Sequence, residues 1–157
     1  MNPAKIRNFE NEHLGRQFPW FQNLNAFETR QIRETLVRAF GAQEVNAPVD
    51  LVTFLDDKAH VVNEVNADAD SFSLLDILRR LGISPQPEIF INWYRFDQID
   101  RMKLDDLADF FQNIWYPSAD DVDIFDSTLS WIVSVTHSGT VKSLFACWDE
   151  EKLRAKQ

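Results

Sequence analysis

The sequence predicts a single α+β domain, residues 1–157, in which helices pack on one face of an antiparallel sheet of about five strands. Three observations support this fold class. The chain has 157 residues, of which 45% are hydrophobic, and this is typical of one packed core. The order of its helix-like and strand-like runs fits an α+β arrangement. The run from 131 to 145 has the alternation of an antiparallel hairpin.

The first predicted helix covers residues 26–40. Asn25 with Glu28 three residues later fits a capping box, in which each side chain accepts a hydrogen bond from a free backbone N–H of the first turn. Gly41 suits the left-handed conformation that ends a helix. Residues 1–23 have no clear periodicity, and we expect them to pack on the body as an N-terminal segment.

A first hairpin is predicted from two strand-like runs. Residues 49–55 are rich in branched and aromatic side chains, which favours a strand. After a turn at 56–59, residues 60–65 are expected to return antiparallel. A third strand is predicted over 88–94 from its apolar and aromatic run.

Two further helices are predicted, over 72–81 and 103–115. The first has leucines at i, i+4 and i+7 and is expected to be capped by Asp70 or Ser71. The second has apolar residues at i, i+3, i+7 and i+10, and Pro117 stops it.

The last predicted hairpin turns at His137, Ser138 and Gly139, with Gly139 in the left-handed region. This loop sorts the flanking side chains onto two faces of a half-buried sheet. One face holds Trp131, Val133, Val135, Val141 and Phe145, and the other holds Ser134, Thr136, Thr140 and Lys142. The tail from 149 to 157 is charged and expected to be helical or frayed.

Charge and cysteine content exclude several classes of protein. The net charge of −9 repels nucleic-acid phosphates and anionic lipid, so we expect neither among the partners. The single cysteine, Cys147, excludes an intrachain disulfide, and its apolar neighbours favour a buried, inert thiol over a nucleophile. No run resembles a signal peptide or a membrane span. We expect a cytoplasmic protein, most simply a bacterial one.

The acidic charge is concentrated between residues 97 and 126, which hold nine aspartates against Arg101 and Lys103. Aromatic side chains ringed by carboxylates suit a basic protein partner, because charge steers the encounter and the rings supply contact area. The alternative is a solvated helix face followed by a polar loop. The predicted partner-binding residues are Asp97, Asp100, Asp105, Asp106, Asp109, Trp115, Tyr116, Asp120, Asp121 and Asp123.

A metal site is the alternative use of the same acids. Asp120, Asp121, Asp123 and Asp126 offer oxygen ligands for Ca²⁺ or Mg²⁺, and with His137 they suggest a metal-dependent hydrolase. The spacing does not match an EF-hand, and the histidines lack zinc-site spacing. Because no catalytic motif or phosphate-binding loop is present, we assign no catalytic residue and expect no cofactor. A regulatory or scaffold domain, acidic for solubility only, is the third possibility.

The run from Trp93 to Val141 carries a series of short motifs. They are IWYP at 114–117, DD at 120–121, IFD at 124–126, WI at 131–132 and HSGTV at 137–141. With them the chain resembles small, acidic, mostly uncharacterised bacterial proteins that are associated with polymorphic-toxin loci and interpreted as immunity proteins. The resemblance implies a protein that binds and neutralises a cognate toxin and performs no chemistry of its own.

Overall fold

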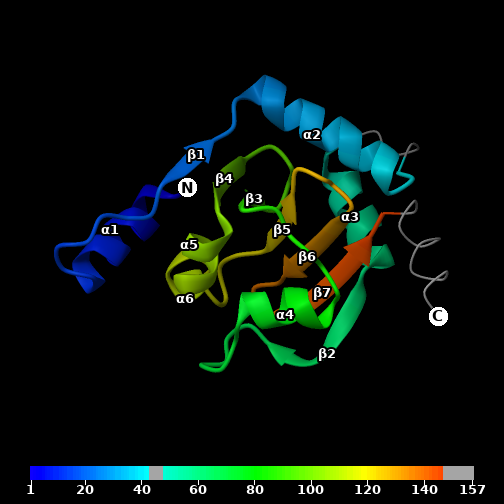
Figure 1. Cartoon of the computed structure of the whole chain (residues 1–157). Coiled ribbons are helices and arrows are strands. Elements are labelled where there is room, and N and C mark those ends of the chain that lie inside the picture. The colour runs from blue at the N-terminus through cyan, green and yellow to red at the C-terminus, as the bar shows by residue number, and fades with distance from the viewer. Residues whose placement is uncertain (43–47, 147–157) are drawn as a thin grey trace.

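A seven-stranded antiparallel sheet forms the centre of the protein (Figure 1). The computed structural model describes residues 1–42 and 48–146. The strands are β1 (Phe21–Asn23), β2 (His60–Asn66), β3 (Glu88–Asn92), β4 (Ile99–Lys103), β5 (Val122–Asp126), β6 (Trp131–Val135) and β7 (Thr140–Phe145). They lie in the order β1-β4-β3-β5-β6-β7-β2. The α+β class is confirmed, but the sheet is larger than the five strands expected.

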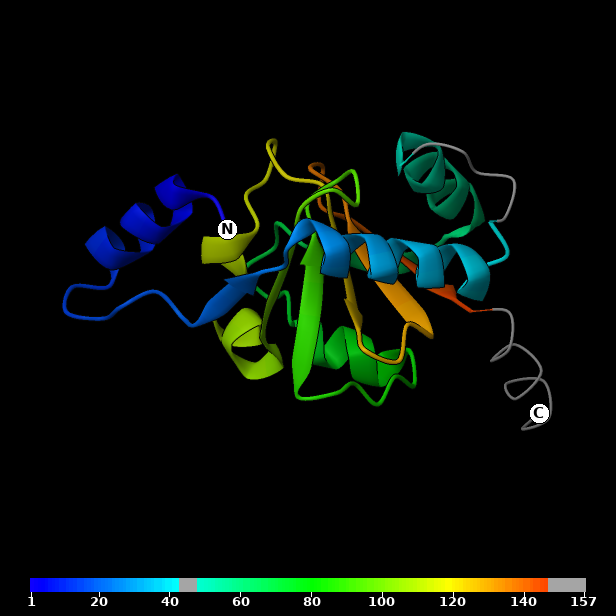
Figure 2. The ribbon, with the colours of Figure 1, turned by 90° about the horizontal axis from the view of Figure 1, so that it is seen from above.

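Helices cover both faces of this sheet rather than the one face predicted (Figures 1 and 2). The helices are α1 (Pro3–Glu12), α2 (Ala26–Ala39), α3 (Pro48–Lys58), α4 (Leu74–Arg80), α5 (Leu104–Asp109) and α6 (Phe111–Ile114). The larger core lies under α1, α4, α5 and α6, and the smaller core lies under α2 and α3. The sheet needs a cover on both faces because both are apolar: Ile132 and Leu144 give the β6–β7 hairpin a second apolar face.

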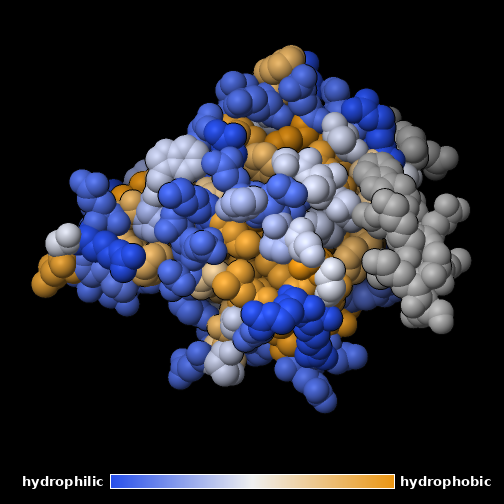
Figure 3. Space-filling view, viewed as in Figure 1, coloured by the Kyte–Doolittle hydropathy of each residue, from blue (hydrophilic) through white to orange (hydrophobic). Residues whose placement is uncertain are grey.

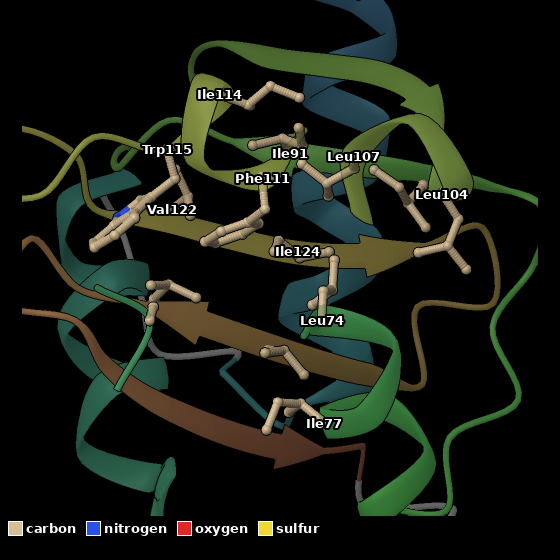
Figure 4. Packing of buried hydrophobic residues seen from close by; sticks show 14 of the residues in the cluster. Leu74, Ile77, Ile91, Leu104, Leu107, Phe111, Ile114, Trp115, Val122 and Ile124 are labelled. Atoms are coloured by element: carbon tan, nitrogen blue, oxygen red, sulfur yellow. The ribbon is translucent and has the colours of Figure 1, made fainter. Parts of the chain in front are cut away.

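Close packing over β5 holds the larger core together. Leu74 from α4 and Phe111 from α6 lie over Val122 and Ile124 (Figure 4). On the outside, apolar residues also gather between α2 and α4, with hydrophilic residues around them (Figure 3). An apolar strip therefore stays at the surface between the two helix layers.

The predicted strand at 49–55 is wrong, because this run belongs to α3 (Pro48–Lys58). Leu51 and Leu55 lie one helical turn apart and are both buried in the smaller core. Proline is also favoured in the first turn of a helix. Burial at helical spacing thus outweighs the strand preference of the branched residues.

Strand β2 exists as predicted, but its partner is β7 and not residues 49–55. The pairing is irregular, since the register shifts between Val61 and Asn66. Glu64 has a left-handed backbone with φ of 62° in this stretch. A bulge of this kind bends an edge strand and interrupts its hydrogen-bonding edge.

The remaining helices match the prediction in part. Helix α2 has the expected capping box, in which Asn25 accepts from Glu28 N and Glu28 accepts from Asn25 N. Helix α4 is capped by Ser73, which accepts from Asp76 N, and not by Asp70 or Ser71. The helix predicted over 103–115 is divided at Phe110 into α5 and α6.

The β6–β7 hairpin has the predicted loop and register. Trp131 pairs with Phe145 and Val135 with Val141, and Gly139 has φ of 82°. An added Cβ at Gly139 would lie 2.0 Å from Oδ1 of Asn66, so a larger residue there would require the Asn66 side chain to move as well as a left-handed backbone.

The N-terminal segment contains α1 and β1, which pack on the body at the β4 edge of the sheet. The ring of Phe9 is fully buried and makes edge contacts with Phe18 and Phe110. Cys147 and the tail at 149–157 lie outside the described residues.

Candidate functional site

A cavity of about 320 Å³ lies at one end of the sheet, beside α3. We call it the Asp123 pocket. Its chemically important lining residues are Asp56, Tyr94, Asp121, Asp123, His137 and Lys142. A larger hollow of about 460 Å³ between β2 and α4 has Glu64 and Asp76 as its acids. The Asp123 pocket is the stronger candidate because acidic, basic and aromatic groups converge on it.

Strand pairing builds the floor of this pocket. Asn92, Asp123, Ser134 and Lys142 are successive cross-strand partners on β3, β5, β6 and β7. Because side chains alternate along each strand, all four point to the same face of the sheet, the one that α2 and α3 cover. One row of polar residues thus crosses four strands at the edge of the smaller core.

Asp123 is the most perturbed acid of the pocket. Its carboxylate accepts hydrogen bonds from Ser134 Oγ at 2.5 Å and from Asn92 Nδ2 at 2.9 Å. Burial nevertheless raises the pKa of Asp123, and the charges of Asp121 and Asp56 add to the rise. The two hydrogen bonds only partly compensate for the loss of water around this carboxylate.

The other two acids of the pocket are paired with cationic or titratable side chains. Asp121 Oδ1 accepts from the backbone N–H of His137 at 2.8 Å and lies 3.0 Å from its Nδ1. Lys142 Nζ donates to Asp56 at 2.5 Å. Both contacts are partly open to water, which screens them and makes them easy to exchange for other partners.

The loop after β3 forms the rim of the pocket. Asn92 Oδ1 accepts from Phe96 N at 2.7 Å, and the ring of Phe96 is buried in the smaller core. Tyr94 and Phe96 have left-handed backbones with φ of 76° and 54°. Asn92 and the anchored Phe96 hold the loop in this costly conformation, which leaves Tyr94 43% exposed beside the acids.

A second acidic group lies around the N-terminal segment, and we call it the N-terminal ionic cluster. Asp100 is fully buried, forms an ion pair with the amino group of Met1 and accepts from Asn23 Nδ2 and Trp93 Nε1. Lys5 Nζ donates to Asp120 at 2.5 Å.

The ammonium group of Lys5 also contacts an aromatic ring. It lies 3.6 Å from the ring centroid of Tyr116, whose backbone N–H donates to Asp120 at 2.7 Å. Burial lowers the pKa of Lys5, while the hydrogen bond and charge of Asp120 oppose this change. Asp120 and Tyr116 therefore hold α1 on the body.

The predicted partner-binding residues do not form one surface. Trp115 is 1% exposed and donates its indole N–H to the carbonyl of Asp120, so it lies in the core and offers no exposed ring. Asp100 is also buried. Asp97 is exposed, in the same loop as Tyr94.

The acids of α5 lie far from the pocket. Asp105 and Asp109 are exposed and Asp106 is half-buried, on a helix that covers the larger core. This helix follows Lys103, which pairs with Glu88 at the other end of β3. Asp123 pairs with Asn92, four residues further along β3. The start of α5 and Asp123 are therefore about 13 Å apart in the direction of the strand.

The four acids proposed as metal ligands also point to different partners. Asp120 pairs with Lys5, Asp121 with His137, and Asp123 with Ser134 and Asn92. Asp126 faces the larger core and accepts from Gln86 N, Thr128 N and Trp131 Nε1. Within residues 1–42 and 48–146, no three His, Cys, Asp or Glu side chains are placed to hold a metal ion.

Several residues that line the pocket or donate a hydrogen bond to Asp123 were not predicted as site residues. Among them are Asp56, Tyr94, Ser134 and Lys142 in the lining, and Asn92, which donates to Asp123. Alternation along the last hairpin already put Ser134 and Lys142 on one face, so this part of the signal was present. Asp56 was not predicted because residues 56–59 were interpreted as a turn. A turn, unlike a helix or strand, has no periodicity that predicts where a side chain points.

Comparison with protein-family models, with curated proteins and with solved structures found no match to this chain. No helix in the described part of the chain has the length and apolar character needed to cross a membrane.

Proposed function

We propose that this chain is a non-catalytic domain that binds a basic protein partner through the Asp123 pocket and its rim. The observation that supports this best is the convergence of three carboxylates, Asp56, Asp121 and Asp123, on one open cavity beside a single lysine. A site with this charge attracts a cationic surface and disfavours phosphate or carboxylate ligands.

The rim adds contact area to the charge. Tyr94 is an exposed aromatic ring at the mouth of the pocket, and tyrosine is among the side chains that contribute most to binding at interfaces. Asp97 is exposed on the same loop, which also carries the exposed Arg95, so the loop offers a charge of each sign at the rim. Anchoring of this loop through Phe96 reduces the ordering that binding would require.

The finer form of the proposal is an immunity protein whose partner is a basic toxin. A compact acidic domain complements a basic nuclease cleft by occupying the place of the phosphates, which would block the toxin without any reaction. The net charge of −9 agrees with such a role. The resemblance of residues 93–141 to immunity-type proteins points the same way.

Quantitative capture from a lysate of the source organism tests the proposal with two charge-matched variants. The pocket variant carries Asp56→Lys, Asp97→Lys and Asp121→Lys, and the control carries Asp105→Lys, Asp106→Lys and Asp109→Lys. We expect a basic protein to be captured at low salt, and the pocket variant to retain at least about tenfold less of it. The control should retain it almost fully.

Each other result has a defined meaning. Equal losses in both variants would indicate non-specific charge attraction and contradict a site at the pocket. Full retention by both would contradict an electrostatic interface and favour a scaffold domain whose acidity serves solubility. Circular dichroism of each variant establishes that it is folded.

A further inference from the structure

The Asp123 pocket has the size and lining for one side chain rather than for a large ligand. Its volume of about 320 Å³ lies at the lower end of the range for ligand pockets, about 300–1,000 Å³. Val52, Leu55 and Val135 contribute apolar wall, and the acids lie beside them. A long side chain with an aliphatic stem and a cationic end matches this division.

We infer that the pocket binds a single arginine side chain of the partner, with the guanidinium on Asp121 and Asp123 and the ring of Tyr94 against it. This inference rests on the proposed function and names the group that anchors the partner. The lining carries three carboxylates against Lys142, a formal charge of −2 with His137 neutral. One guanidinium would offset half of that charge.

Hydrogen-bonding capacity at the acids favours the same guest. Each oxygen of Asp123 accepts one hydrogen bond, and a carboxylate oxygen has room for two. Asp121 uses Oδ1 for both of its bonds, and Oδ2 accepts none from the part of the chain that the structure describes. The pocket therefore offers acceptors to an incoming donor without losing its own bonds.

The electrostatics of Asp123 agree with a cationic guest. Its carboxylate is half-buried beside two other acids, and the loss of water around it outweighs its hydrogen bonds enough to raise its pKa. A cation bound beside it would favour the charged form and reverse this shift.

Arginine suits the pocket better than lysine. Its planar fork donates to two carboxylates at once, whereas an ammonium group is a compact and strongly hydrated charge. The guanidinium plane also stacks on aromatic rings, and Tyr94 supplies one at the mouth, where the guanidinium of Arg95 in the same loop lies 5.7 Å from the ring centroid. We therefore expect the partner to present an exposed arginine at the centre of its contact surface.

Titration of the ¹⁵N-labelled chain with capped arginine, N-acetyl-arginine N-methylamide, tests this inference. We expect saturable shifts of the backbone amides at 94, 121–123 and 134–137, weaker shifts with capped lysine, and none with capped citrulline. Citrulline has the shape of arginine without its charge. Asp123→Asn should weaken arginine binding about tenfold or more, while Asp109→Asn should leave it unchanged.

The other outcomes would overturn the arginine pocket. Equal shifts with citrulline would show that charge is not recognised. Shifts spread over α5, or no shift at capped arginine concentrations on the order of 10 mM, would place no arginine site at the pocket. If the pocket variant still loses the captured partner in that case, the proposed function stands and only the arginine anchor is wrong.

Discussion

The N-terminal ionic cluster and the Asp123 pocket share the acidic segment 97–126, from which the pocket takes two of its three acids, but they use these acids in opposite ways. In the cluster, Asp100 is fully buried and has three donors, and Asp120 holds Lys5. In the pocket, Asp121 pairs with the exposed His137 and Asp56 with the half-buried Lys142. An acidic segment thus contains both structural ion pairs and charge that remains available to a partner.

The supply of cations explains this difference. Helix α1 brings Lys5 and the amino group of Met1 to one side of the sheet, where burial makes the pairing necessary. The pocket side receives Lys142 for three carboxylates. We therefore expect that neutralising a charged side chain of the cluster lowers the free energy of unfolding, whereas neutralising one at the pocket leaves it almost unchanged.

The largest expected effect is that of Asp100→Asn. Asparagine has a single acceptor oxygen for three donors, one of them the buried amino group of Met1, and its NH₂ group would face another donor. We expect the free energy of unfolding to fall by about 3–5 kcal/mol, measured by urea denaturation. The matched change Asp121→Asn at the pocket should cost less than about 1 kcal/mol. Similar losses for both would contradict the distinction.

A smaller effect is expected for the lysines. Lys5→Met removes the ion pair with Asp120 and the contact with Tyr116, while the new side chain still fills the space. In this variant Asp120 still accepts a hydrogen bond from the backbone N–H of Tyr116 and still contacts water. We therefore expect the free energy of unfolding, measured by thermal or urea denaturation, to fall by about 1–3 kcal/mol. Lys142→Met, which breaks the half-exposed pair with Asp56, should change stability by less than about 1 kcal/mol. The reverse order would show that α1 is not held by its charge.

The smallest effect is a change in the pH dependence of stability. Burial raises the pKa of Asp123 above its ordinary 3.8, so the folded chain binds more protons than the unfolded chain between 3.8 and the raised pKa. Stability from this group is fully present below that window and is lost as pH rises through the raised pKa. Asp123→Asn removes this loss.

We therefore expect Asp123→Asn to gain stability relative to the wild type as pH rises, in urea denaturation from roughly pH 4 to 8. Asp109→Asn, at an exposed position on α5, serves as the control and should give a constant difference. A constant difference for Asp123→Asn as well would mean that its carboxylate is not perturbed by burial.

Patterns among residues close in sequence predicted some elements of this fold, but they gave no signal for others. The capping box at Asn25 and the alternation around Gly139 depend on neighbours in sequence, and both predictions were confirmed. Strand β4 was missed because Asp100 interrupts its apolar alternation. The buried carboxylate of Asp100 is neutralised by the amino group of Met1, which is far away in sequence. A buried charge with a distant partner has the same local appearance as a loop residue.

The candidate site was predicted in the same partial way. Asp121 and Asp123 were included because they belong to a dense acidic run. The run gave no sign that Asp123 points into a pocket while Asp126 faces the larger core, because β5 was interpreted as a loop. Once β5 is known to be a strand, the odd spacing between the two residues places them on opposite faces.

The strand order of the sheet has a consequence for synthesis on the ribosome. Both edges, β1 and β2, lie within the first 66 residues, and their partners β4 and β7 follow at 99–103 and 140–145. The edge strands therefore leave the ribosome before the central strands. When α2 and α3 emerge, the sheet that their apolar faces will cover has not yet formed. The outermost pairing, of β2 with β7, can form only after residue 145 has left the exit tunnel, so the sheet is completed by its most distant contact in sequence.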